Sequence, residues 1–150
     1  MSSSGRNEAI FHYRMTTRNR LLIEMSVLIL LLSVVQLLGI FQGAYAKFWW
    51  LDMPMHFLGG AFIGISAIWF YFYSGYWPFP PRQAKGRDFM FLAITATFIV
   101  AGVWELYEYV LGPFFTYSSY KLDTTKDIIL GMLGSVAGSA YFVNTKLKGR

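Results

Sequence analysis

The 150-residue sequence contains no cysteine and few charged residues. The lack of cysteine excludes disulfide bonds, thiolate metal sites and cysteine nucleophiles. Only 14% of the residues are Asp, Glu, Lys or Arg, whereas soluble domains carry about 25%, so the chain has too little polar surface for water. Hydrophobic residues make up 55% of the chain and aromatic residues 19%. This composition predicts an integral membrane protein, with membrane lipids as its partners.

Motifs of several other function classes are also missing. The sequence has no phosphate-binding loop and no serine nucleophile elbow. It has no basic face separate from the hydrophobic segments, so no nucleic-acid partner is expected. The net charge of +5 instead reflects basic flanks of the kind that orient membrane helices.

Four apolar runs account for most of the chain. Each has about the 20 residues that a membrane helix needs, and they cover approximately residues 21–41, 51–73, 89–111 and 123–143. A polar and basic tail, residues 1–20, precedes the first run. Gly112 and Pro113 end the third run, because proline cannot continue a helix. The expected fold is all-α, a four-helix transmembrane bundle forming one domain over residues 1–150.

The basic residues predict the orientation of this bundle. Ten of the thirteen Lys and Arg residues lie in the N-terminal tail, in the loop 74–88 or in the C-terminal tail. The positive-inside tendency places these three segments in the cytoplasm. We therefore expect a multi-pass protein of the cell (inner) membrane, with both termini cytoplasmic and the two other connectors facing outward.

This topology brings three pairs of polar residues to one level of the membrane, at the outer ends of helices two, three and four. The pairs are Asp52 and His56, Glu105 and Glu108, and Asp123 and Asp127. Each pair is spaced by three or four residues, so its members share one helix face. Because charged side chains facing lipid are costly, the three faces are expected to turn inward and converge on one cavity.

A bound divalent metal is the simplest way to stabilise such a cluster. Several carboxylates at close range cannot all stay ionised unless a cation or protons are present. Lys126 directly precedes Asp127, so we expect it to point to a different face and to be a poor counter-ion. Oxygen ligands with one histidine suit Mg, Mn, Fe or Zn. The expected metal ligands are His56, Glu105, Glu108, Asp123 and Asp127, while Asp52 or a metal-bound water would supply acid–base chemistry.

The residues leave the function open among three classes. The first is a metal-dependent membrane enzyme that acts on a lipid or envelope-precursor headgroup. The second is a non-enzymatic ion or proton pathway, for which the cytoplasmic half offers only Glu24, Gln36, Ser66 and Thr95. The third is a structural or assembly subunit, in which a hydrogen-bonded polar cluster fixes the helix packing. Neither the oligomeric state nor a substrate follows from the sequence.

The second and fourth runs share a spacing pattern. Asp52-x3-His56-x3-Gly60 matches Asp123-x3-Asp127-x3-Gly131, which is a weak indication of a parallel internal repeat. The fourth run also carries a face of small residues, which predicts close packing against another helix. This face consists of Gly131, Gly134, Gly138, Ser135 and Ser139.

Three motifs carry a resemblance to known families. They are Leu-Asp-Met-Pro-Met-His-Phe at residues 51–57, Trp-Glu-Leu-Tyr-Glu-Tyr at 104–109, and Asp-Thr-Thr-Lys-Asp-Ile at 123–128. Over roughly residues 49–140 the chain resembles the YjdF-like inner-membrane proteins and, more distantly, the VanZ-like proteins. Glu108 and Gly131 depart from the VanZ-like pattern, which has glutamine and asparagine there. The VanZ-like resemblance implies a role at the cell envelope, and the YjdF-like resemblance implies no particular activity.

Overall fold

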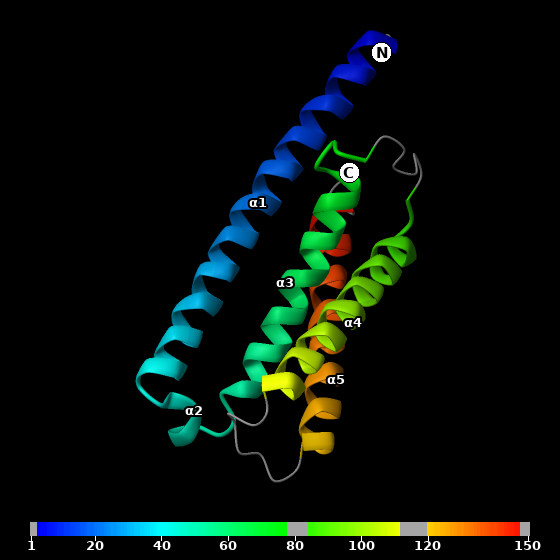
Figure 1. The fold of residues 1–150 in the computed structure, drawn as a ribbon. Helices are drawn as coiled ribbons and strands as arrows, with labels where there is room; N and C mark the ends of the chain where they lie inside the picture. Colours follow the sequence, from blue (N-terminus) through cyan, green and yellow to red (C-terminus); the bar gives the residue numbers. More distant parts are fainter. Residues whose placement is uncertain (1–2, 78–83, 112–119, 148–150) are drawn as a thin grey trace.

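The computed structural model describes residues 3–77, 84–111 and 120–147 (Figure 1). Its elements in chain order are α1 (Ser3–Phe41), α2 (Ala44–Lys47), α3 (Asp52–Phe72), α4 (Gly86–Leu111), α5 (Tyr120–Phe142) and the π-helical turn η2 (Val143–Leu147). The part of the chain that the structure describes contains no strand. Four helices are long and apolar enough to cross a membrane. The prediction of an all-α transmembrane bundle of four helices is confirmed.

Helix α1 extends beyond the apolar run that predicts it. It begins at Ser3, so the basic segment expected as a tail before residue 21 continues the helix. Residues 7–38 include neither glycine nor proline, and no residue in this stretch would therefore interrupt the backbone hydrogen bonds. The candidate membrane span covers only the apolar part, Met15–Phe41.

The short helix α2 folds back onto the end of α1. Gly43 has a φ of 62°, a left-handed conformation that favours glycine and turns the chain between the two helices. The Tyr45 hydroxyl donates a hydrogen bond to Gln36 Oε1. A Cβ atom at Gly39 would collide with the Tyr45 ring, so the glycine provides the space for this contact.

Helices α3 and α5 are parallel neighbours that touch through their backbones. A Cβ atom added at Gly60 would collide with the Gly131 carbonyl group, and one added at Gly134 would collide with the Phe57 carbonyl group. Further along the crossing, a Cβ at Gly138 would lie 3.1 Å from the Ala61 carbonyl oxygen. The predicted close packing of the small-residue face of α5 is therefore confirmed. Glycines at such a crossing allow the helix axes to approach closely.

The bundle has two chemically different ends. The start of α3, the end of α4 and the start of α5 lie together near the α1–α2 turn, and we call this the site end (Figure 1). The apolar core lies toward the opposite, far end. Its fully buried side chains, with no exposed surface, include Leu21, Ile68 and Phe142, and aromatic contacts join Phe89 to Phe142 and Phe72.

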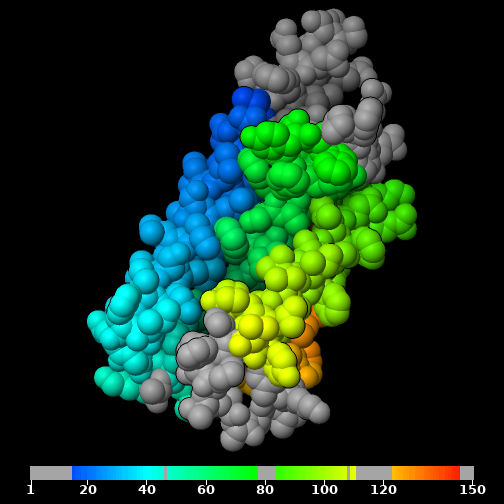
Figure 2. Space-filling view, viewed as in Figure 1, coloured from blue at the N-terminus to red at the C-terminus, as the bar shows by residue number. Residues whose placement is uncertain are grey.

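Helix α1 lies at the periphery of the bundle beside α3 (Figure 2). Many of its apolar side chains, such as Ile23 and Leu30, are exposed, as expected for a surface that faces lipid. A hydrogen bond of 3.2 Å from the Tyr141 hydroxyl to Glu24 Oε1 ties α1 to α5. In the same view α3 and α4 lie in front of α5, and α3 packs against α1, α4 and α5.

Candidate metal centre

The first turns of α3 supply two neighbouring polar side chains. Asp52 is the first residue of this helix, and Pro54 follows within the first turn, where a proline is tolerated because its missing N–H would have no helical partner. His56 lies one turn later on the same face. Its Nε2 atom is 3.2 Å from Asp52 Oδ1.

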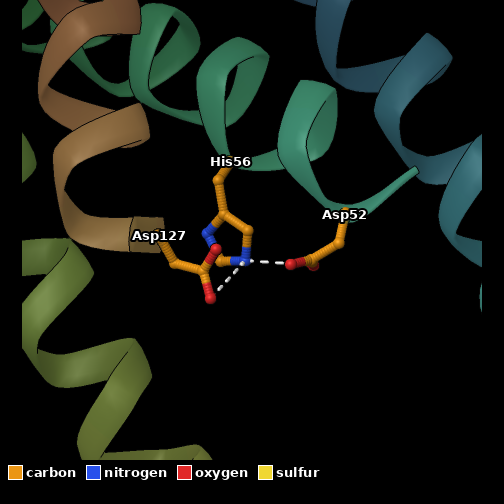
Figure 3. A group of neighbouring side chains, drawn as sticks. All are labelled: Asp52, His56 and Asp127. Atoms are coloured by element: carbon orange, nitrogen blue, oxygen red, sulfur yellow. Dashed lines mark ion pairs between the residues drawn. The ribbon is translucent and has the colours of Figure 1, made fainter. Parts of the chain in front are cut away.

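Helix α5 adds a carboxylate from the other side. Asp127 Oδ2 lies 3.7 Å from His56 Nε2, so His56 stands between two aspartates from different helices (Figure 3). The Asp127 side chain is only 4% exposed, whereas that of Asp52 is 33% exposed. The group of three side chains is therefore accessible from outside the bundle at Asp52 and inaccessible at Asp127.

These three side chains have the spacing of a metal-ligand set. Asp52, His56 and Asp127 each offer one ligand atom, and these atoms all lie within 4.8 Å of one another. Ligands at about 2.1 Å from a tetrahedral metal ion are separated by about 3.4 Å. The two distances to His56 Nε2, 3.2 and 3.7 Å, fall on either side of this value. Three protein ligands would leave a coordination position open for water or substrate, as catalytic sites do.

Lys126 also belongs to the cluster, and the expectation that it is a poor counter-ion is wrong. Its Nζ atom lies 2.7 Å from Asp123 Oδ1 and 3.4 Å from both Asp52 Oδ2 and Asp127 Oδ1. Two physical reasons explain the difference. Lys126 follows Asp123 by three residues, so these two side chains share a helix face. The long aliphatic part of a lysine also lets its ammonium group reach groups beside that face.

The two outer aspartates of the triplet divide their oxygen atoms between two partners. Asp52 Oδ1 and Asp127 Oδ2 face His56 Nε2. Asp52 Oδ2 and Asp127 Oδ1 face Lys126 Nζ. A cation beside His56 Nε2 and the lysine ammonium can therefore use different oxygens of the same carboxylates. A neighbouring group that binds the second oxygen of a metal ligand can orient that ligand.

The cluster keeps an excess of negative charge. Three carboxylates, those of Asp52, Asp123 and Asp127, surround the single ammonium of Lys126. With His56 neutral and all three carboxylates ionised, the cluster has two negative charges in excess of the ammonium. Asp127 Oδ1 is buried and makes no hydrogen bond within the described part of the chain. The excess charge of the cluster equals the charge of one divalent cation.

The family described as "Predicted membrane protein (DUF2238)" matches residues 9–147. The chain belongs to this family. The match agrees with the YjdF-like resemblance and covers all four candidate spans of this DUF2238 protein. No curated protein and no solved structure matches the chain.

The other acidic residues expected at the metal differ in their positions in this DUF2238 protein. Asp123 joins the cluster through Lys126 and is not one of the three residues within ligand distance of one another. Glu105 is buried, with 6% of its surface exposed, near the end of α4, and it also lies outside that group of three. The side chain of Glu108 lies outside the described residues.

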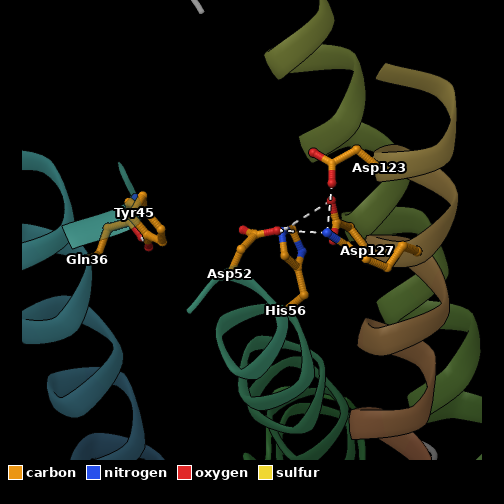
Figure 4. Close-up of polar contacts among 7 residues, drawn as sticks. Gln36, Tyr45, Asp52, His56, Asp123 and Asp127 are labelled. Carbon is orange, nitrogen blue, oxygen red and sulfur yellow. Dashed lines mark hydrogen bonds and ion pairs between the residues drawn. The ribbon is translucent and has the colours of Figure 1, made fainter. Parts of the chain in front are cut away.

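The spacing shared by the two helices corresponds to facing positions in the structure. His56 faces Asp127 (Figure 4). Gly60 touches Gly131, and Lys126 links Asp52 to Asp123. Equivalent positions of the two patterns therefore lie at the same level of the parallel pair. The pattern describes two helices in matched register. Gln36 and Tyr45 form a separate contact away from this cluster.

Sequence reasoning missed Lys126, although a signal for it was present. The spacing of Lys126 from Asp123 predicts contact between them as strongly as the spacing of Asp52 from His56 does. A second missed residue is Thr97, whose buried hydroxyl donates a 3.4 Å hydrogen bond to the Gly60 carbonyl and connects α4 to the crossing of α3 and α5.

Proposed function

We propose that this protein is a membrane metalloprotein that binds a divalent cation at the site end and acts on the headgroup of a lipid or envelope precursor. The observation that carries the proposal is the triplet of Asp52, His56 and Asp127, whose ligand atoms lie within 4.8 Å of one another. The remaining negative charge around Lys126 supports a divalent ion. Zinc, manganese, iron and magnesium all fit one imidazole with two carboxylates.

The less exposed residues of the site would bind the metal, and the more exposed residue would transfer protons. His56 and the buried Asp127 would fix the ion, and Lys126 would hold the far oxygens of both aspartates. The bound metal would polarise a phosphoryl or carbonyl oxygen and activate a water molecule. Asp52 is the more exposed ligand, so it or that water would serve in proton transfer. Glu105, Glu108 and Asp123 remain proposed additional ligands from the outer ends of their helices.

The orientation of the site determines which substrates could reach it. The distribution of basic residues predicts cytoplasmic termini, which would turn the site end toward the outer face of the inner membrane. Headgroups of lipids and envelope precursors lie at that depth. The distant VanZ-like resemblance points to the same compartment, and it rests on the three motifs alone.

A second candidate function is a structural role for the polar cluster. The observation in its favour is Lys126, because a lysine among three aspartates stabilises them in part without any metal. An ion or proton pathway has less support. Immediately beyond the site, α3 and α5 meet through the backbones of Gly60 and Gly131, and Ile68 and Phe142 are fully buried farther along.

Elemental analysis of the purified protein tests the proposal. The wild-type protein should carry close to one equivalent of a divalent transition metal or bind Mn²⁺ stoichiometrically after dialysis. Both His56→Gln and Asp127→Asn should weaken binding by about tenfold or more, because each removes a ligand. Asp88→Asn is the matched control, since this aspartate lies at the start of α4 at the far end and accepts a hydrogen bond from the Lys85 amide.

The result also separates the two candidate functions. If neither the wild-type protein nor the control carries or binds metal, the metal proposal is refuted. A purely structural cluster predicts that His56→Gln and Asp127→Asn lower the thermal stability of metal-free protein. A metal site predicts instead that added Mn²⁺ raises the stability of wild type and leaves that of Asp127→Asn nearly unchanged.

A further inference from the structure

The site end carries a lysine ammonium beside the proposed metal position. The Lys126 side chain is 32% exposed, while that of Asp127 beside it is 4% exposed. The ammonium is held by Asp123 at 2.7 Å and by two more distant carboxylates, so it is fixed at the mouth of the site. A positive group fixed at the entrance will meet any ligand that approaches the metal position.

Exposed aromatic residues mark the depth of this entrance. Trp49 and Trp50 lie just before Leu51, the N-cap of α3, and Trp104, Tyr107 and Tyr109 lie in the last turns of α4. All five are exposed. Tryptophan and tyrosine collect at the level of lipid headgroups, where an apolar ring can have a hydrated polar edge. Asp52 begins α3 two residues after Trp50, so we infer that the site opens at the depth where lipid phosphates lie.

Metal binding changes which ligands this entrance would attract. Without a metal, three carboxylates outweigh one ammonium and the cluster repels anions. A divalent ion beside His56 would cancel the two remaining negative charges. The loaded site would then present two neighbouring cations, the metal and Lys126, on either side of the same two carboxylates.

We propose that Lys126 and the bound metal together form a binding site for a phosphate group. This inference rests on the proposed metal site and names its substrate class as a phosphate-bearing headgroup. A phosphate can place one oxygen on the metal and another on the ammonium, as lysine and metal ions do together in phosphoryl-transfer sites. Lys126 is thus a substrate-binding residue, and Asp123 positions it by accepting its shortest contact.

Binding experiments on detergent-purified, Mn²⁺-loaded protein test this assignment. Inorganic phosphate is titrated by calorimetry, and dioleoyl phosphatidic acid is compared with dioleoylglycerol by native mass spectrometry. The two lipids have the same acyl chains and differ in the phosphate. Wild-type protein should prefer phosphatidic acid by about tenfold and should lose this preference when the metal is removed. Binding of both probes indicates recognition of phosphate alone, whereas binding of only the lipid indicates a membrane source.

Three variants make the test specific to Lys126. At Mn²⁺ concentrations that saturate both proteins, as measured by electron paramagnetic resonance, Lys126→Met should lose the preference for phosphatidic acid that wild-type protein shows. Lys126→Arg keeps the charge and should retain the preference. Lys47→Met is the matched control, because Lys47 is an exposed lysine of α2 at the same end of the bundle.

The outcomes separate the two proposals. If wild-type protein binds no Mn²⁺, both proposals fail. If Mn²⁺ binds and the preference for phosphatidic acid is absent, or is equal in Lys126→Met and wild type, the phosphate assignment fails and the metal site stands. A phosphate preference of equal size in metal-free wild-type protein also refutes the assignment, and this measurement does not require the Lys126→Met variant to fold.

Discussion

Two adjacent glycines of α3 provide a sharp test of the packing that holds the site together. Gly59 and Gly60 are adjacent glycines of the same helix, so they differ mainly in what surrounds them. A Cβ atom at Gly59 would meet nothing within 4 Å, whereas one at Gly60 would lie 2.6 Å from the carbonyl carbon and 2.7 Å from the Cα of Gly131. We therefore compare Gly59→Ala with Gly60→Ala.

The expected effects have opposite signs. Alanine at Gly59 should stabilise α3 by about 0.5–1 kcal/mol, because alanine has the higher helix propensity. Alanine at Gly60 must push α3 and α5 apart by about 1 Å to restore a carbon–carbon contact of about 3.5–4.0 Å. Overpacking of this kind costs about 1–3 kcal/mol. A difference of about 3 kcal/mol between the variants corresponds to roughly 6–12 °C in unfolding temperature.

Thermal unfolding in detergent, followed by circular dichroism, measures this difference. Gly60→Ala should also weaken Mn²⁺ binding, since the crossing lies one turn from His56 and Asp127, which come from the two separated helices. Equal unfolding temperatures for the two alanine variants would refute the close backbone contact. Lower stability with unchanged Mn²⁺ affinity would refute only the link between the crossing and the site.

Further predictions concern the ends of the bundle. Lys126→Met should destabilise metal-free protein by about 1–2 kcal/mol, because it removes the ammonium among three carboxylates, and Mn²⁺ should restore part of the loss in the same unfolding assay. Tyr141→Phe should cost about 0.5–1.5 kcal/mol by deleting the hydrogen bond to Glu24. The chain has no cysteine, so single cysteines report topology without background. An impermeant maleimide applied to spheroplasts should label Lys47→Cys and not Lys85→Cys, and the reverse pattern would place the site in the cytoplasm.

Much of the fold could be predicted because hydrophobicity and length decide it. Runs of about 20 apolar residues leave the backbone no alternative to helix inside a membrane. The same reasoning placed His56 and Asp127 at one depth, since each lies near the start of a span that crosses in the same direction. Hydropathy does not indicate where a helix ends outside the apolar segment. It therefore does not predict that α1 continues through the basic segment to Ser3.

The details of the site required coordinates because they depend on reach and on register between helices. Sequence spacing indicates which helix face carries a residue but not how far its side chain reaches. It therefore does not predict that the Lys126 ammonium contacts the carboxylates of Asp52 and Asp127. Spacing also could not say which carboxylates come within ligand distance of His56. Asp52 and Asp127 form with His56 the group of three whose ligand atoms lie within 4.8 Å of one another, and Glu105 is buried near the end of α4.

The glycine crossing and the polar cluster are best understood as one arrangement. Two parallel helices that touch through Gly60 and Gly131 cannot slide or rotate without a steric clash, so the crossing fixes their register. One turn away, that register places Asp127 beside His56. A metal ion tolerates errors of only a few tenths of an ångström in the positions of its ligands. Ion binding requires a rigid contact of this kind next to the ligands. A polar cluster that served only to join α3 and α5 would add little, because the glycine contact already joins these helices. The packing therefore favours the metal over the structural role.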